Sequence, residues 1–135
     1  MKNFLLAFLF SCLCFSAYST TWTVTNSGTT FVPADITINL GDSVNFSIQN
    51  AHTVVEVSYA TWLANGNTPL PGGFSLPNGG GMLYPAQLPT GIHYYVCGPH
   101  AANGMKGTIT VQDCAVPSKP GTITGNATFR CFRAV

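Results

Sequence analysis

The segment Cys97-Gly-Pro-His100-Ala-Ala-Asn-Gly-Met105 gathers a thiol, an imidazole and a thioether within nine residues, between two strand-like runs. A second imidazole, that of His52, lies 45 residues earlier, at the start of another apolar run. Two histidines and one cysteine, with a weak methionine on the axis, are the ligand set of blue copper electron-transfer sites. A loop held by strands at both ends can present three of these groups to one point, and a neighbouring strand end can supply His52. The sequence therefore predicts a copper site at one end of a β-structure.

Alternation of apolar and polar residues indicates short, half-buried strands along most of the chain. The clearest runs lie at 22–25, 36–40, 44–48, 54–57, 92–96 and 108–111. Gly41-Asp42 separates the second and third runs and predicts that they form a hairpin, whereas Pro33 interrupts the chain before them. Ser58 is a suitable cap for a short helix over 58–65. Together these signals predict an all-β, two-sheet sandwich with one short helix.

The region 65–91 is the least regular part of the chain. It holds seven glycines and five prolines, and residues 82–84 form its only strand-like patch. We expect a long loop here, which in a compact domain is usually functional or a surface insertion.

The first 19 residues have the pattern of a secretory signal peptide. Lys2 gives a positive start, residues 4–10 are wholly apolar, and small residues follow. The apolar stretch is too short to span a bilayer, so we expect an exported protein that is periplasmic, surface-bound or secreted, without stable membrane insertion. Cys12 offers a lipoprotein-type cleavage site as a second possibility. The remaining chain has the size of one domain, which we place at 20–113.

Cysteine usage agrees with export. Cys97, Cys114 and Cys131 remain after the signal segment, and the latter two flank a Pro/Gly-rich stretch and can pair in an oxidising compartment. Cys97 is then the unpaired thiol, and a bound metal would protect it by holding it as a thiolate ligand. The tail 114–135 is either a flap closed by a Cys114–Cys131 disulfide or the truncated start of a further β repeat.

Charge excludes some classes of partner. The chain after residue 19 carries four basic and four acidic side chains: Lys106, Lys119, Arg130, Arg133, Asp35, Asp42, Glu56 and Asp113. No basic patch for nucleic acid and no run of like charge is present. We expect a monomer whose contacts with other proteins are weakly steered by charge.

These motifs resemble those of the cupredoxins, of the plastocyanin and azurin class. Cys97-x2-His100-x4-Met105 has the spacing of the plastocyanin ligand loop. The pattern over 31–46, Phe-x-Pro-x-x-Ile-x-Ile-x-x-Gly-Asp-x-Val-x-Phe, is similar to the early strands of that family, and residues 52–58 also resemble phytocyanins. The resemblance covers about residues 21–111. It implies a Greek-key β-sandwich holding one type 1 copper, with His52, Cys97 and His100 as equatorial ligands and Met105 as the weak axial ligand.

The same resemblance implies that His100 is a partly exposed electron port, surrounded by apolar residues such as Pro99 and Ala101. Two positions depart from the plastocyanin pattern, because Thr53 stands where asparagine is usual and Gly98 where serine is frequent. We therefore expect the hydrogen bond that usually links the two ligand segments to be altered here.

The function that fits best is that of a one-electron carrier cycling between Cu(I) and Cu(II), with a redox protein docking near His100. Copper storage or delivery is the first alternative, although such proteins tend to be rich in Met and His, and this chain has three of each. A metal-free immunoglobulin-like adhesion module, with Cys97 in a disulfide, is the second. A copper enzyme needs paired histidines for a second centre, and only His93 is left over, in a strand position expected to face solvent. We therefore predict that the protein is not an enzyme.

Overall fold

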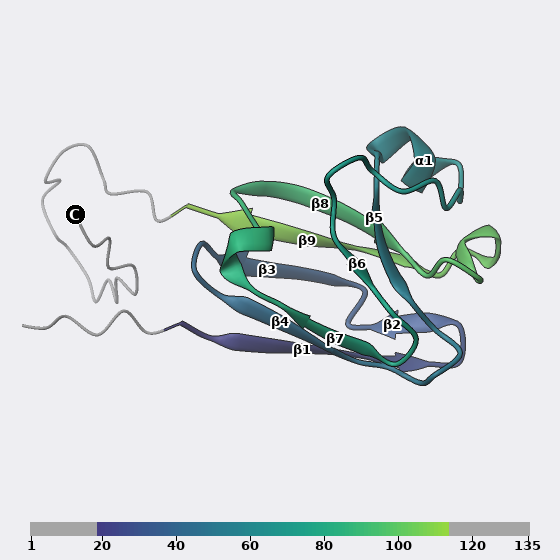
Figure 1. Ribbon diagram of the computed structural model, residues 1–135, viewed down its shortest axis with the longest axis horizontal. Coiled ribbons are helices and arrows are strands. Elements are labelled where there is room, and N and C mark those ends of the chain that lie inside the picture. Colours follow the sequence, from purple (N-terminus) through teal and green to yellow (C-terminus); the bar gives the residue numbers. More distant parts are fainter. Residues whose placement is uncertain (1–18, 114–135) are drawn as a thin grey trace, which may run out of the picture.

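Two β-sheets packed face to face form the body of the protein (Figure 1). The computed structural model describes residues 19–113. The predictions for the signal segment 1–19 (apart from Ser19), for Cys12 and for the Cys114–Cys131 tail fall outside this range. The elements are β1 (Thr21–Ser27), β2 (Thr30–Val32), β3 (Asp35–Asn39), β4 (Ser43–Ser47), β5 (Val54–Val57), α1 (Tyr59–Leu63), β6 (Ser75–Leu76), β7 (Gly80–Leu83), η1 (Pro85–Gln87), β8 (Gly91–Val96), η2 (Ala101–Asn103) and β9 (Lys106–Gln112). No helix in this range is long and apolar enough to cross a membrane.

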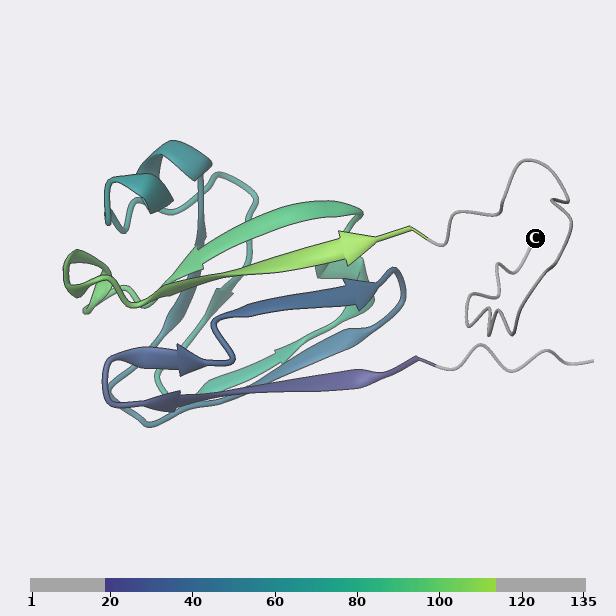
Figure 2. The same cartoon turned by 180° about the vertical axis from the view of Figure 1, so that it is seen from behind.

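One sheet has the strand order β2-β1-β4-β7 and the other β3-β9-β8-β5-β6. β1 pairs with β4 and β3 with β9 in parallel, and the remaining pairs are antiparallel. Figure 2 shows β3 and β9 running in the same direction along one side of the sandwich. The all-β sandwich with one short α-helix is thus confirmed.

The core lies between the sheets, because each strand turns alternate side chains inward. In β3 the buried side chains are those of Ile36 and Ile38, and in β4 they are those of Val44 and Phe46. The rings of Phe31, Phe46 and Tyr95 pack edge to face at the centre, with centroids 5.0–6.1 Å apart. The phenol of Tyr95 donates to the Ala34 carbonyl at 2.7 Å, and burial raises its pKa.

The predicted hairpin over residues 36–48 is wrong. β3 pairs with β9 and β4 with β1, so the chain crosses from one sheet to the other at Gly41-Asp42. Both strands carry their apolar residues on the inward face, which an alternation pattern cannot distinguish from two paired strands of one sheet. The buried carboxylate of Asp42 stabilises the crossing, because it accepts hydrogen bonds from the backbone of Thr20 and Asn39 and from the Trp22 indole.

The remaining elements either agree with the predictions made from the sequence or differ from them in detail. The helix forms as α1, with the Ser58 hydroxyl accepting from the Thr61 amide at 3.1 Å. The segment before Pro33 is the short strand β2, which lies at a sheet edge and ends at Val32. The region 65–91 is less irregular than expected, since β6, β7 and η1 lie within it.

Candidate metal centre

The predicted site residues converge at one end of the sandwich because β5 and β8 are paired. Val55 lies opposite Val96 in this pairing. His52, just before β5, and Cys97, just after β8, therefore reach the same end of the sheet. This end carries α1 and the loop after β8, and it lies opposite the end where the described chain begins and finishes (Figure 1).

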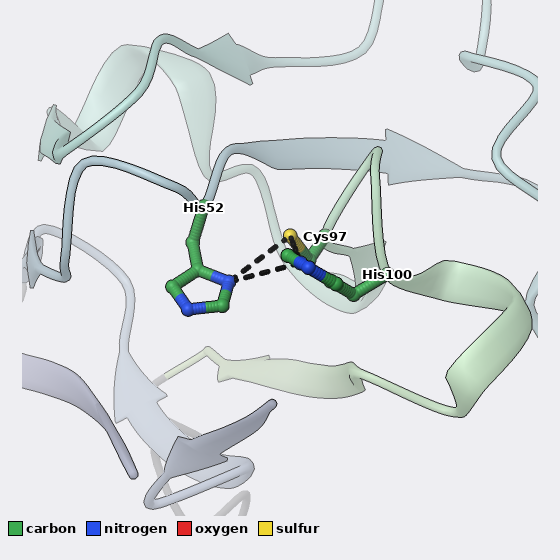
Figure 3. Close-up of side chains that lie close together, drawn as sticks. All are labelled: His52, Cys97 and His100. Atoms are coloured by element: carbon green, nitrogen blue, oxygen red, sulfur yellow. Dashed lines mark hydrogen bonds between the residues drawn. The ribbon is translucent and has the colours of Figure 1, made fainter. Parts of the chain in front are cut away.

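The three donor atoms of His52, Cys97 and His100 form a small triangle (Figure 3). The Cys97 Sγ lies 3.6 Å from the His52 Nδ1 and 3.3 Å from the His100 Nδ1. The two Nδ1 atoms are 3.1 Å apart. Both imidazoles thus present the same ring nitrogen to one thiol, as ligands of a common ion would.

Burial differs among the three side chains. Cys97 is fully buried and His52 is 4 % exposed, whereas His100 is half-buried. Burial, with a contribution from the neighbouring His100, lowers the pKa of His52. The neutral imidazole that binds metals is thereby favoured at this position. Cys97 is a free thiol. The alternative of a metal-free adhesion module requires Cys97 to form a disulfide, so this structure disfavours that alternative.

Met105 closes the ligand loop, which we define as residues 97–105. The Cys97 amide donates to the Met105 carbonyl at 2.9 Å, and the Met105 amide donates to the His100 carbonyl at 3.2 Å. Gly104 turns the chain in a left-handed conformation, with φ 81°, which glycine adopts at little cost. The Met105 side chain is fully buried in the same cluster as Cys97, so all four predicted residues lie around this loop.

The two segments that carry ligands are joined by a hydrogen bond that uses the residues present at the two departing positions, 53 and 98. The Gly98 amide donates to the Thr53 Oγ1 at 3.0 Å. A Cβ added at Gly98 would itself lie 3.0 Å from that oxygen, which is a tight contact. The threonine hydroxyl and the glycine backbone amide therefore link the two segments, and the absence of a side chain at Gly98 leaves room for the Thr53 oxygen.

The surroundings of His100 differ in part from the expectation. Pro99 is exposed beside it, but Ala101 is only 2 % exposed and packs with Val57 and Val96 beneath the loop. Ala101 thus supports the loop from inside rather than forming part of an apolar surface.

His93 is buried, and the prediction that it faces solvent is wrong. Its Nδ1 lies 2.7 Å from a Glu56 carboxylate oxygen, and its Nε2 lies 2.8 Å from the Pro89 carbonyl. The second Glu56 oxygen accepts from the Phe74 amide at 3.0 Å. Glu56 is remote from His93 in sequence, so no local pattern could reveal this pair.

The Glu56–His93 pair predicts a pH-dependent stability. The hydrogen bond with Glu56 raises the pKa of His93 above its usual value of 6.5, against the opposing effect of burial. A folded-state pKa above the unfolded value contributes stability that is complete below pH 6.5 and is lost as the pH rises through the folded value. We therefore expect the difference in unfolding free energy between the wild type and His93→Gln to shrink as the pH rises.

Urea unfolding of both metal-free proteins over a range of pH would measure this difference. His52 titrates in the opposite sense, because its pKa is lowered, but it is present in both proteins and cancels. A difference that stays constant with pH would contradict the assignment.

The donor set fits copper. Within residues 19–113, His52, Cys97 and His100 are the one cluster of at least three His, Cys, Asp or Glu side chains with this geometry, and their donor atoms lie within 4.8 Å of one another. A thiolate with two imidazoles and a nearby thioether is a soft, nitrogen- and sulfur-rich set, unlike the oxygen ligands of Mg²⁺ or Ca²⁺.

Comparison with known proteins agrees with this assignment. Residues 18–112 match the family described as copper binding proteins, plastocyanin/azurin family. No match is found among curated proteins. Among solved structures, the fold is similar to that of spinach plantacyanin, with a TM-score of 0.55 and 22% identity over 69% of this chain and 100% of that one. It is also similar to pseudoazurin from Methylobacterium extorquens AM1, with a TM-score of 0.51 and 19% identity over 67% of this chain and 74% of that one.

The family match spans both sheets and the ligand loop, and the structure supplies the donor geometry independently. His52, Cys97, His100 and Met105 are arranged as a type 1 copper site. The chain belongs to the plastocyanin/azurin family of copper-binding proteins.

Proposed function

We propose that this protein is an exported blue copper protein that carries single electrons between redox partners. His52, Cys97 and His100 act as equatorial ligands and Met105 as the weak axial ligand. The observation that carries the proposal is the triangle of two Nδ1 atoms and one buried Sγ. Bound copper supplies a one-electron couple between Cu(I) and Cu(II), and a trigonal His₂Cys set with a distant methionine suits both states.

The chain's own residues keep the site closed and rigid. Cys97 and Met105 are fully buried and His52 nearly so, which keeps water from the sulfur. The backbone bonds within the ligand loop and the Gly98–Thr53 bond fix the donors before any metal binds. A preorganised site changes little when an electron arrives or leaves, and burial and hydrogen bonding around the sulfur tune its potential.

His100 is the route by which electrons reach the centre. It is the one half-exposed member of the donor triangle, while the other two are buried. Lys106 is the only lysine or arginine in residues 19–113. Docking of a redox partner near His100 therefore depends on contact and shape more than on charge steering.

Two observations favour an electron carrier over the alternatives. The donor set is closed, so a partner protein that exchanges copper would have little access to the metal. This disfavours a role in copper delivery. The remaining histidine, His93, is engaged by Glu56 and Pro89, and so offers no second copper centre for an enzyme.

Addition of Cu(II) to the protein tests the proposal. We expect one equivalent to produce an intense blue thiolate-to-copper band, and voltammetry to show one reversible one-electron wave. His93→Gln is the matched control, because it removes a histidine outside the triangle and should keep the band. A protein that stays colourless with Cys97 reduced would refute the electron-carrier function, and a blue protein without a reversible wave would favour copper storage.

A further inference from the structure

The end of α1 and the turn that follows it contact both ends of the ligand loop. We call residues 62–67 the brace. This segment covers the last two residues of α1 and the start of the connection to β6, and it supplies none of the four predicted ligands. Figure 1 shows α1 and the ligand loop at the same end of the molecule.

The C-terminal end of the ligand loop is bound to the brace through Lys106, which directly follows Met105. Its Nζ donates to the Asn65 Oδ1 at 2.7 Å and to the Trp62 carbonyl at 2.9 Å, and lies 4.1 Å from the centroid of the Trp62 ring. In return, the Trp62 indole donates to the Gly107 carbonyl at 3.1 Å. The strand that starts after Met105 is therefore fixed to the brace by three hydrogen bonds.

The N-terminal end is tied through Asn67. Its side-chain amide donates to the Gly98 carbonyl at 3.0 Å. Gly98 also donates its own amide to Thr53 on the other side, so both backbone polar groups of the residue after Cys97 have partners outside the loop.

The brace is itself well ordered by local contacts. The Gly66 amide donates to the Thr61 carbonyl at 2.8 Å. Asn65 has φ 55°, a left-handed conformation that asparagine tolerates better than most residues. The Trp62 ring packs against Tyr94 of β8, with centroids 5.6 Å apart. The brace can therefore transmit its position to the loop.

We propose that the brace positions the copper ligands, with Asn65 and Asn67 as positioning residues that hold the two ends of the ligand loop at their present separation. This inference rests on the proposed function for its effect on copper, but its effect on the loop does not require the metal. Within the loop the hydrogen bonds are backbone bonds apart from the Cys97–His100 contact, so the contacts at its ends add to the packing of Ala101 and Met105 in placing it on the sandwich. Removal of the hydrogen bond made by either asparagine side chain should make the loop less rigid without changing the charge near the site.

The test uses Asn67→Leu, which keeps the branched shape but removes the donor, and Asn65→Gly, which removes the acceptor and keeps the left-handed backbone available. Asn39→Leu is the matched control, because Asn39 has an exposed side chain in β3 and pairs with Gln112, at the end of β9 away from the ligand loop. Amide hydrogen exchange of Cys97, Gly98 and Met105 is measured in the metal-free proteins. The visible spectrum and the electron self-exchange rate are measured in the copper-loaded ones.

We expect exchange of these amides to accelerate about 2- to 10-fold in both brace variants, as the net worth of one hydrogen bond implies. Self-exchange should slow and the spectrum should change, because a less rigid site rearranges more when an electron arrives, whereas Asn39→Leu should match the wild type. If the brace variants show faster amide exchange but an unchanged spectrum and self-exchange rate, the brace stabilises the loop without positioning the copper ligands, and the proposal is overturned. Brace variants that behave like Asn39→Leu in every measurement would overturn it as well. A wild-type protein that binds no copper would refute the proposed function, and amide exchange in the metal-free proteins would still decide whether the brace holds the loop.

Discussion

The Cys97→Ser protein is expected to lose the blue absorption band completely and to bind Cu(II) at least about 100-fold more weakly, beyond the usual 10- to 100-fold effect of removing an outer-shell partner. The band arises from charge transfer between a thiolate and copper. A serine hydroxyl at this position stays protonated and is a hard, neutral donor. Sγ is also the atom that approaches both imidazole nitrogens, so its loss removes the common point of the triangle. Visible absorption during a copper titration measures both effects.

Two controls make this result specific. Serine is nearly the same size as cysteine, so circular dichroism of the metal-free variant should match the wild type. Cys114→Ser and Cys131→Ser should keep the band, because those cysteines lie outside the family match at residues 18–112. A blue band that survives in Cys97→Ser would assign the thiolate to another cysteine and contradict the site.

The Gly107→Ala protein is expected to lose more than about 4 kcal/mol of unfolding free energy, enough to unfold many domains. A Cβ at Gly107 would overlap the Ala34 carbonyl and the Tyr95 phenol. That carbonyl accepts from both the Tyr95 hydroxyl and the Thr108 amide, so it cannot move aside without breaking two hydrogen bonds. Overpacking of this kind has no flexible side chain to absorb it. Urea unfolding, or the yield of folded protein, measures the loss.

Gly28→Asn is the comparison for this variant. Gly28 has φ 54° and nothing within 4 Å of an added Cβ, and asparagine tolerates that backbone conformation. We expect a change within about 1 kcal/mol. Gly107→Ala combined with Tyr95→Phe should remain unstable, because the Ala34 backbone still blocks the methyl group. Near-wild-type stability of Gly107→Ala would show that β9 can shift away from Ala34.

The strands of this fold could be predicted from sequence, but their partners could not. The runs at 36–40 and 44–48 alternate because each lines one side of the core. Alternation records which face of a strand is buried and not which sheet the strand joins, so a sheet-to-sheet crossing at Gly41-Asp42 looked like a hairpin turn. The two-residue strand β6 was missed because its pairing with β5 depends on residues remote in sequence.

More of the metal site than of the strand pairing could be predicted from the sequence. Cys97, His100 and Met105 lie in one loop, so their spacing alone carries information, and His52 was found because it begins a strand-like run. The residues that support the loop carry no such signal. Thr53, Asn67 and Lys106 act through contacts across the sheet end, and His93 is buried only because Glu56 meets it from the neighbouring strand.

The parallel pairing of β3 with β9 has a consequence for how the protein acquires its site. Asp35 lies opposite Thr108 in this pair, 73 residues later in the chain. Contacts so distant along the chain make folding slow, since loop-closure entropy is lost before the contact forms. All four proposed ligands precede β9, yet β9 is the strand that joins β3 to β8. A chain that stopped at Met105 would therefore contain every ligand and the paired strands β5 and β8, but it would lack the strand that joins them to β3 and holds the C-terminal end of the ligand loop. The metal centre is thus supported by the last strand of residues 19–113.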